Sequence, residues 1–238
     1  DTNDWVIDTA FSQLDKVDIY LIANNRLIAQ SRQGKLRSSQ EFRLPTLKAE
    51  LPFATPIDLY VRIESASSSL IAPIFIQSER KHTRISFFDN LVWGLFYGGL
   101  IVLAIYSSVL YPSNKEASMM AYVSYIVSVL LWQFTWGGHI QMLFPNGFTV
   151  WLGQHIDLIF ILTAITSGVF TSKFLDVRNT APKIAPFLSI FLIILAVLGF
   201  CSFFNLIPVL VQNTLVYAFG IAAIISFLIA GFESYLNH

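Results

Sequence analysis

Two long apolar runs between Phe88 and His139, joined by a short polar turn, constrain this chain more than any other feature. The run Leu91–Tyr111 contains no charged residue. At about 1.5 Å per residue it forms a helix of roughly 30 Å, which matches the hydrocarbon core of a bilayer. Met119–Phe144 is a second run without Asp, Glu, Lys or Arg, and Pro112 ends the first run because proline cannot continue a helix. The pattern predicts a transmembrane helical hairpin.

The charged residues divide the chain into two parts. Of the charged side chains, 21 lie before residue 88 and nine lie after it, although hydrophobic residues make up 55% of the whole chain. We therefore expect a polar domain over residues 1–87 and a membrane domain over residues 88–238. A net charge of zero argues against a nucleic-acid partner. Cys201, the single cysteine, lies in an apolar run and is expected to be a core residue.

The polar domain has the sequence pattern of β-strands. Residues Ile57–Glu64 alternate between apolar and polar side chains, which is typical of a strand with one buried face. Val17–Leu21 alternates too, and Asn24-Asn25 behind it suits a tight hairpin turn because asparagine tolerates positive φ. Further candidate strands are Glu41–Leu47 and Leu70–Gln77. The pattern predicts an all-β sandwich or jelly roll.

The ends of the chain suggest that it is a piece of a longer protein. It begins at Asp1 without a methionine, directly in a strand-like stretch, and Glu233–His238 resembles a helix leaving the membrane. We therefore expect the β domain to lack its first strands.

Three outward side chains of the predicted sheet are candidates for ligand binding. Tyr20, Tyr60 and Arg62 are expected on the wet face of their strands, where they suit a carbohydrate or a carboxylate. The alternative is that they are ordinary solvated strand residues. Glu79–Arg84, just after the sheet, is expected to be a charged connector at the membrane surface.

The membrane domain is predicted to contain five spans with short connectors. Proline lies at or beside several of their boundaries, where a helix tolerates it. The expected spans are Asn90–Tyr111, Met119–Phe144, Trp151–Leu175, Ile184–Phe204 and Val209–Phe232.

The basic residues predict the orientation of these spans. Lys115 lies in the first connector, and Lys173, Arg178 and Lys183 flank the third, whereas the second and fourth connectors contain no Lys or Arg. Basic connectors stay on the cytoplasmic side of a membrane. We therefore expect the polar domain to lie outside and the end of the chain to be cytoplasmic.

Several polar side chains fall near the outer ends of the second and third spans: Gln133, His139, Gln141, His155 and Asp157. Ionisable groups inside a membrane are candidates for function. His155 and Asp157 are two residues apart, so on a helix they point away from each other, and we expect no metal site. Two interpretations remain open, a structural polar cluster at the water interface and a signal-responsive cluster.

The order of the motifs resembles the bacterial seven-transmembrane receptors with diverse intracellular signalling modules. The polar part likewise resembles the extracellular β domain of that family, whose strands carry patterns such as Val17–Tyr20 and Leu59–Arg62. In the membrane part the resemblance rests on Gly94–Gly98, Tyr122–Tyr125, Gly137-Gly138, Phe144-Pro145 and Thr171–Asp176.

The resemblance implies the sensory region of a signal-transduction protein in the bacterial inner membrane. It implies seven spans, where five are counted here, and a cytoplasmic diguanylate cyclase or histidine kinase module (as in two-component systems) beyond His238. The implied partners are membrane lipid and a carbohydrate-like periplasmic ligand or an envelope protein. A homodimer is a further expectation.

Two other function classes remain as alternatives. A transporter or channel subunit requires charges along a path through the membrane, and Asp157 is the one acid inside the predicted spans before Glu233. A membrane enzyme would have to use His139, His155 and Asp157. The sequence contains no GxSxG, HExxH or phosphate-binding glycine motif, so we expect neither catalysis nor a cofactor in this chain.

Overall fold

The computed structural model describes residues 4–37, 42–52, 55–66, 71–144, 146–204 and 206–236. Of the positions named above, Asp1, Glu41, Leu70, Pro145 and His238 lie outside them. The chain divides into two compact units, which we describe separately. Unit 1 comprises Asp1–Phe96 and Gln133–Gln154, and unit 2 comprises Tyr97–Trp132 and His155–His238.

Strands precede helices along the chain. The strands are β1 (Asp4–Thr9), β2 (Lys16–Ala23), β3 (Arg26–Gln33), β4 (Thr46–Glu50), β5 (Ile57–Glu64) and β6 (Ile74–Ser78). The helices are α1 (Glu79–Asn114), α2 (Ala117–Trp136), α3 (His139–Leu143), α4 (Gly147–Gln154), α5 (Ile156–Phe174), α6 (Val177–Thr180), α7 (Ala185–Phe203) and α8 (Val209–Leu236).

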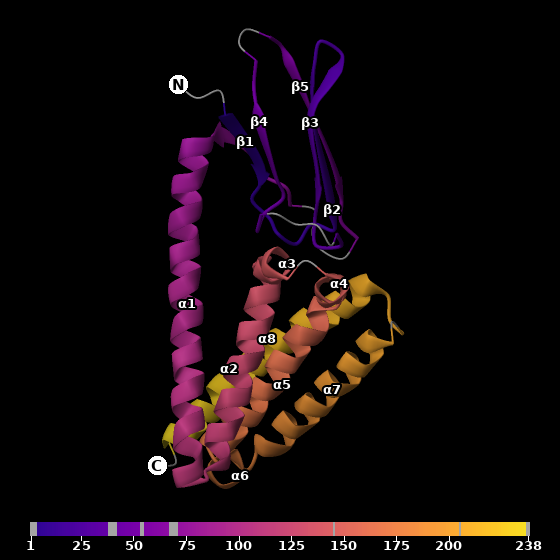
Figure 1. The fold of residues 1–238 in the computed structure, drawn as a ribbon. Coiled ribbons are helices and arrows are strands. Elements are labelled where there is room, and N and C mark those ends of the chain that lie inside the picture. The colour runs from indigo at the N-terminus through magenta and orange to yellow at the C-terminus, as the bar shows by residue number, and fades with distance from the viewer. Residues whose placement is uncertain are drawn as a thin grey trace. The chain divides into compact units, whose positions relative to one another are not determined.

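The β domain, strands β1–β6 with their loops, consists of two antiparallel three-stranded sheets (Figure 1). Their strand orders are β4-β1-β6 and β3-β2-β5. One apolar core joins the two sheets, because Ile7 and Leu47 from the first pack with residues of β2 such as Ile19 and Leu21. The prediction of an all-β domain before a helical region is therefore confirmed.

Local sequence explains the second sheet. Asn24 and Asn25 have φ of 50° and 58°, so they form the two-residue turn between β2 and β3 that the sequence predicts. The alternation of Ile57–Glu64 is confirmed as well, because the apolar side chains of β5 pack on the core while Asp58, Tyr60 and Arg62 are exposed. The alternating pattern determines which side chains of this sheet face the core, because one face of the sheet is buried and the other faces water.

A buried ion pair fixes the loop that follows β3. Lys35 is 2% exposed, and its Nζ lies 3.3 Å from Oδ1 of the equally buried Asp15. Gly34 beside it has φ of 130°, and a Cβ there would lie 2.6 Å from the carbonyl oxygen of Asp15. Only glycine fits such a position, so the Lys35–Asp15 pair depends on it.

Helix α1 is longer than the sequence predicts at both ends. The expected connector Glu79–Arg84 forms its first turns, continuing directly from β6. At the other end α1 passes Pro112 and ends at Asn114. The helix continues for two residues after Pro112, and the N–H of Lys115 closes the last turn by donating to the carbonyl of Tyr111 at 2.7 Å.

The run Met119–Phe144 is not one helix. It ends as α2 at Trp136, turns at Gly138, whose φ is 79°, and resumes as the short α3. The next run is also broken, because His155 separates α4 from α5. Glycine in the left-handed conformation is the usual end of a helix, which explains the first break.

Helix α4 begins at Gly147 because of a reciprocal cap. The N–H of Thr149 donates to Oδ1 of Asn146 at 3.0 Å, and the N–H of Asn146 donates to Oγ1 of Thr149 at 3.3 Å. Each side chain thus satisfies a backbone donor that the first turn leaves without a partner.

Unit 2 is a packed group of apolar helices. Ile161 of α5, Leu195 and Leu198 of α7 and Val216 of α8 form its core. A hydroxyl pair, Ser128 and Thr166 at 2.7 Å, links α2 to α5. Among the described residues, α1, α2, α5 and α7 are long and apolar enough to cross a membrane. Side chains of α8 lie partly outside the described residues, so the fifth span stays a prediction.

We predict that Gly34→Ala destabilises the protein by more than about 2 kcal/mol, because the new Cβ meets backbone atoms and the backbone conformation becomes strained. Chemical unfolding of the full chain in detergent micelles measures this. Gly147→Ala is the matched control, since nothing lies within 4 Å of its Cβ. Equal effects of the two substitutions would contradict the role given to Gly34.

Candidate functional site

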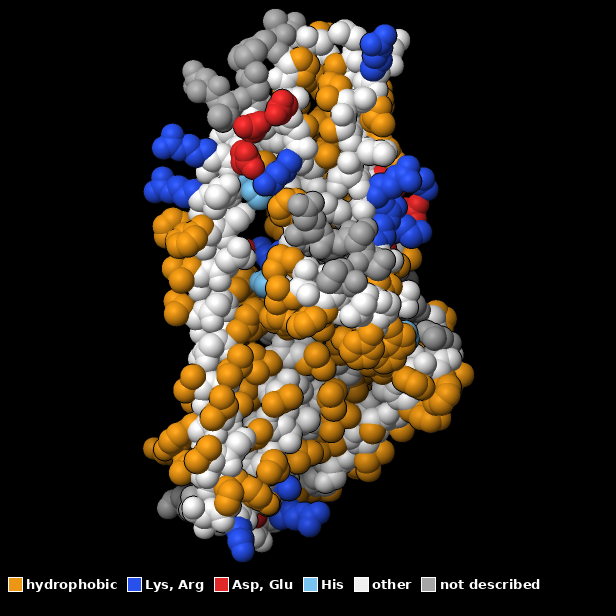
Figure 2. All heavy atoms as spheres, viewed as in Figure 1, with side chains coloured by type: hydrophobic (Ala, Val, Ile, Leu, Met, Phe, Trp, Pro, Cys, Tyr) orange, Lys and Arg blue, Asp and Glu red, His pale blue; other side chains and the backbone are white. Residues whose placement is uncertain are grey.

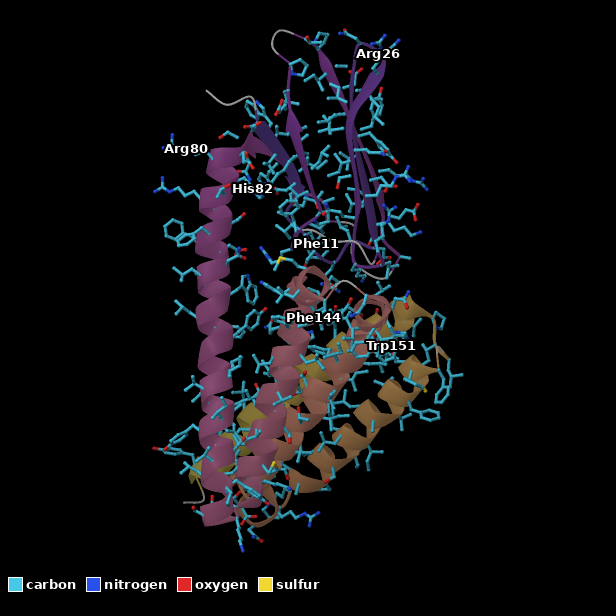
Figure 3. All side chains as sticks on the ribbon, viewed as in Figure 1. Phe11, Arg26, Arg80, His82, Phe144 and Trp151 are labelled. Carbon is cyan, nitrogen blue, oxygen red and sulfur yellow. The ribbon has the colours of Figure 1, made fainter. Side chains whose placement is uncertain are left out.

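One face of the first turns of α1 is bound to the β domain. Two ion pairs and one contact between a carboxylate and a histidine make this attachment at roughly helical spacing, and all three lie in unit 1. The pairs are Lys48 Nζ with Glu79 Oε1 at 2.9 Å, Asp8 Oδ2 with His82 Nε2 at 3.7 Å, and Arg43 with Asp89. Figure 3 shows His82 on the side of α1 that faces the β domain.

Asp8 lies buried under this face. Nε2 of Gln77 donates to its carboxylate at 3.0 Å, and the carboxylate is within 3.7 Å of His82. Burial nevertheless raises the pKa of Asp8 above its ordinary value, against the lowering effects of Gln77 and His82. The contact between β1 and α1 is therefore a polar one that is mostly buried on the side of β1.

The C-terminal end of α2 is held by side chains of the β domain. The last carbonyl groups of a helix have no partner within it and carry the negative end of its dipole. Oγ of Ser12 donates to the carbonyl of Trp136 at 2.7 Å, and Nε2 of Gln13 donates to the same oxygen at 2.5 Å and to that of Thr135 at 3.3 Å. The loop between β1 and β2 thus caps α2.

Arg43 joins three elements through one side chain. Its Nη1 donates to the carbonyl of Gly137 at 3.3 Å, while Nη2 pairs with Asp89 of α1. Its own backbone also packs closely, since a Cβ on Gly138 would lie 2.6 Å from the carbonyl oxygen of Arg43. We call Ser12, Gln13, Arg43, Asp89 and the carbonyls of residues 135–137 the coupling site.

His139 lies at this site among aromatic rings. It is 6% exposed, with ring centroids 5.3 Å from Trp93 and 5.6 Å from Phe134. Burial and the nearby charge of Arg43 lower its pKa to about 4, with Asp89 acting in the opposite direction. His139 is therefore neutral at pH 7, which suits a site that already contains a guanidinium group.

The predicted polar cluster is distributed over both units. Gln133 and His139 belong to unit 1, where the carbonyl of Gln133 accepts a hydrogen bond from the N–H of Gly137 at 2.8 Å. His155 and Asp157 belong to unit 2. His155 precedes the first turn of α5, and Asp157 accepts a hydrogen bond from Ser202 of α7. The part of the chain that the structure describes holds no group of three His, Cys, Asp or Glu residues able to bind a metal.

The predicted ligand residues lie together on the outer face of the second sheet. Tyr20 and Tyr60 are directly opposite each other on β2 and β5, and Arg62 is opposite Asp18 in the neighbouring row. Nη2 of Arg62 donates to Glu64 at 2.5 Å, and Lys16 donates to the same carboxylate at 3.0 Å. Lys16 and then Arg62 lower the pKa of Glu64. This face therefore carries two tyrosine rings next to the charged side chains of Arg62, Glu64 and Lys16.

A cleft that the sequence does not indicate lies at the turn between β2 and β3. Its volume is about 720 Å³, in the range of small-molecule sites. Apolar side chains and two opposite charges line it. The lining residues are Ala23, Asn24, Arg26, Ile28, Glu50, Leu51, Pro52 and Thr55.

The sequence does not predict the coupling site either. Ser12, Gln13 and Arg43 lie in loops, where no periodicity marks them, and they meet α2 from more than ninety residues away along the chain. The signal available was Gly137-Gly138, because a helix that ends at glycines exposes carbonyls that need donors.

Comparison with known families identifies both parts of the chain. A family model described as 7TM diverse intracellular signalling matches residues 89–238, and a model described as 7TMR-DISM extracellular 2 matches residues 1–78. The chain belongs to the 7TMR-DISM family. This confirms the resemblance found in the sequence. No curated protein and no solved structure matches the chain.

Membership of the 7TMR-DISM family gives the coupling site its context. The family consists of membrane sensory receptors, so this chain is part of a multi-pass membrane protein with an extracellular N-terminal domain. Both matched models are sensory rather than catalytic. In this 7TMR-DISM protein the coupling site is where loops of the extracellular domain bind α1 and α2.

We predict that acid destabilises this 7TMR-DISM chain through His139. Below pH 6.5 the unfolded chain binds a proton at this residue, whereas the folded chain does not until about pH 4. Stability from this group is therefore complete above pH 6.5 and falls by about 3 kcal/mol as the pH drops to 4.

Unfolding free energies of the wild type and His139→Gln, measured from pH 8 to pH 4, test this prediction. The wild type should lose about 3 kcal/mol more than the variant over that range. Parallel curves for the wild type and His139→Gln would show that His139 is not the group responsible.

Proposed function

We propose that this chain is the sensory region of a receptor in the bacterial inner membrane. The β domain (residues 1–87) binds a ligand in the periplasm, and the helix bundle (residues 88–238, seven spans in the whole protein) carries the signal. A cytoplasmic diguanylate cyclase or histidine kinase module receives it. The observation that supports this function is the coupling site, where the β domain binds two membrane helices.

The contacts of the coupling site are strong enough for transmission. A hydrogen bond to a charged group contributes about 1.5–3 kcal/mol, and Arg43 has one partner on α1 and another in the turn directly after α2. Allosteric coupling between sites usually amounts to about 1–3 kcal/mol. A displacement of the loops that carry Ser12, Gln13 and Arg43 therefore moves the helix ends with them. Breaking the hydrogen bonds between loops and helices would cost as much free energy as the coupling itself provides.

Helix α1 contains a glycine-rich stretch. Gly94, Gly98 and Gly99 lie within six consecutive residues of it. Nothing lies within 4 Å of a Cβ built on these glycines. Glycine weakens a helix by about 1 kcal/mol relative to alanine, so this part of α1 deforms more easily than an alanine-rich stretch would.

The ligand that we propose is carbohydrate-like and binds the face formed by Tyr20, Tyr60 and Arg62. Tyrosine rings provide flat apolar surface with a polar edge, and Arg62 provides a donor for a hydroxyl or carboxylate. A signal requires that the ligand bind one state of the receptor better than the other. An envelope protein on the same face, and a homodimer as the signalling form, belong to the same proposal.

The orientation in the membrane follows from the basic connectors. Lys115 lies in the first connector, and Lys173, Arg178 and Lys183 flank the third, which favours a cytoplasmic location for both connectors. With five spans, the end of this chain is also cytoplasmic. The transporter alternative rests on Asp157, and its carboxylate already accepts a hydrogen bond from Ser202.

Ligand-dependent melting of the full chain in detergent micelles tests the proposed function. The probes are glucose, galactose, N-acetylglucosamine and galacturonate, each added separately. We expect at least one to raise the melting temperature, because a ligand at a hundred times its Kd stabilises the folded state by about 2.7 kcal/mol.

Two variants locate the binding site. Tyr60→Ala should abolish the stabilisation, whereas Tyr106→Ala, an exposed tyrosine of α1, should leave it unchanged. Stabilisation that survives Tyr60→Ala would place the ligand elsewhere, with the cleft at Arg26 and Glu50 as the next candidate. No stabilisation by any probe would count against carbohydrate sensing.

A further inference from the structure

The first turns of α1 carry a basic surface on the face turned away from the β domain. Arg80, Lys81 and Arg84 are exposed, and no ion-pair partner for them occurs within residues 4–37, 42–52, 55–66 and the other described ranges. At about 100° per residue, Arg80 and Arg84 lie opposite His82 on the helix. Figure 3 shows Arg80 and His82 on opposite sides of α1.

Exposed apolar side chains follow this basic surface directly. Ile85, Phe87 and Phe88 are 51%, 63% and 55% exposed. Figure 2 shows the same sequence of colours along α1, with blue basic groups followed by orange apolar ones. Phe87, Phe88 and the next apolar residue, Leu91, share the helix face of Arg84. A single exposed surface therefore changes from cationic to apolar within two turns.

The spacing along the helix fits the layers of a bilayer. The uncharged run begins at Leu91, and at 1.5 Å per residue Phe88 lies about 5 Å and Arg84 about 10 Å outside that position. The headgroup layer on each side of the hydrocarbon core is about 5–8 Å thick. The aromatic rings thus coincide with the boundary, and the long side chain of Arg84 extends to the level of lipid phosphates.

The acids of the same helix segment do not neutralise these cations. Glu79 pairs with Lys48, and Asp89 pairs with Arg43, both on the face toward the β domain. Basic residues next to a span are normally cytoplasmic, yet these lie on the extracellular side. Arg84 lies next to the headgroup layer, and Lys81 and Arg80 lie one helical turn further out, within about a Debye length of it. These three adjacent cations are therefore complementary in charge to anions of the membrane surface.

We propose that Arg80, Lys81 and Arg84 bind the phosphate groups of anionic phospholipids in the leaflet next to the β domain. Phe87 and Phe88 contact the acyl chains of the same lipids. Because the opposite face of α1 is bound to Asp8 and Arg43, the lipid fixes the same helix segment that the coupling site uses. This inference goes beyond ligand sensing and does not depend on it.

Lipid retention measured by native mass spectrometry tests the proposal. The full chain is purified from nanodiscs that contain equal amounts of phosphatidylglycerol and phosphatidylcholine. We expect the wild type to retain phosphatidylglycerol preferentially. In the double variant Arg80→Gln/Arg84→Gln this preference should fall by about fivefold for each of the two cations removed. Inorganic phosphate added to the buffer should not displace the lipid, because it has no acyl chains.

The matched control is Arg26→Gln/Arg32→Gln, which removes two exposed cations of the β domain. It should keep the preference of the wild type, and melting temperatures should show that both variants fold. The same preference in Arg80→Gln/Arg84→Gln as in the control would overturn the proposal, as would no preference for phosphatidylglycerol in the wild type. The second result would favour an acidic protein as the partner of this surface.

Discussion

The carbonyl groups at the end of α2 have no partners within their helix, and satisfying them is the constraint on which unit 1 depends. Gly138, with its positive φ, ends the helix, and donors from the β domain then complete it. Ser12 and Gln13 come from the loop between β1 and β2, and Arg43 comes from the segment before β4. Because Arg43 also pairs with Asp89, the β domain and the outer ends of two membrane helices form one body.

That body connects the extracellular domain to the membrane helices of the receptor. The polar contacts of the coupling site are partly buried, and removing one partner leaves the other without its hydrogen bond, so the β domain and the helix ends respond together. His139 is neutral beside these contacts, because a second cation next to Arg43 would be repelled there. The cations on the free face of α1 add the membrane itself as a third partner of this helix.

The sequence predicts those parts of the fold that local patterns determine. The alternation of Ile57–Glu64 and the Asn24-Asn25 turn are visible because each depends on neighbours along the chain. The reciprocal cap of Asn146 and Thr149 also depends on neighbours along the chain and could have been predicted. The apolar run Trp151–Leu175 behind it instead suggested one continuous helix. The coupling site was not predictable, because glycine also occurs within membrane helices and the donors that make Gly138 a helix end are distant in sequence.

Hydrogen–deuterium exchange of the full chain in detergent micelles tests the central claim, that the β domain and the outer ends of α1 and α2 form one body. The comparison is between Arg43→Gln and Arg26→Gln, an exposed arginine of β3. Our account predicts that Arg43→Gln accelerates exchange together in residues 10–15, 82–93 and 133–143, and that Arg26→Gln changes exchange only near itself. Acceleration confined to residues 42–46 in Arg43→Gln would contradict it.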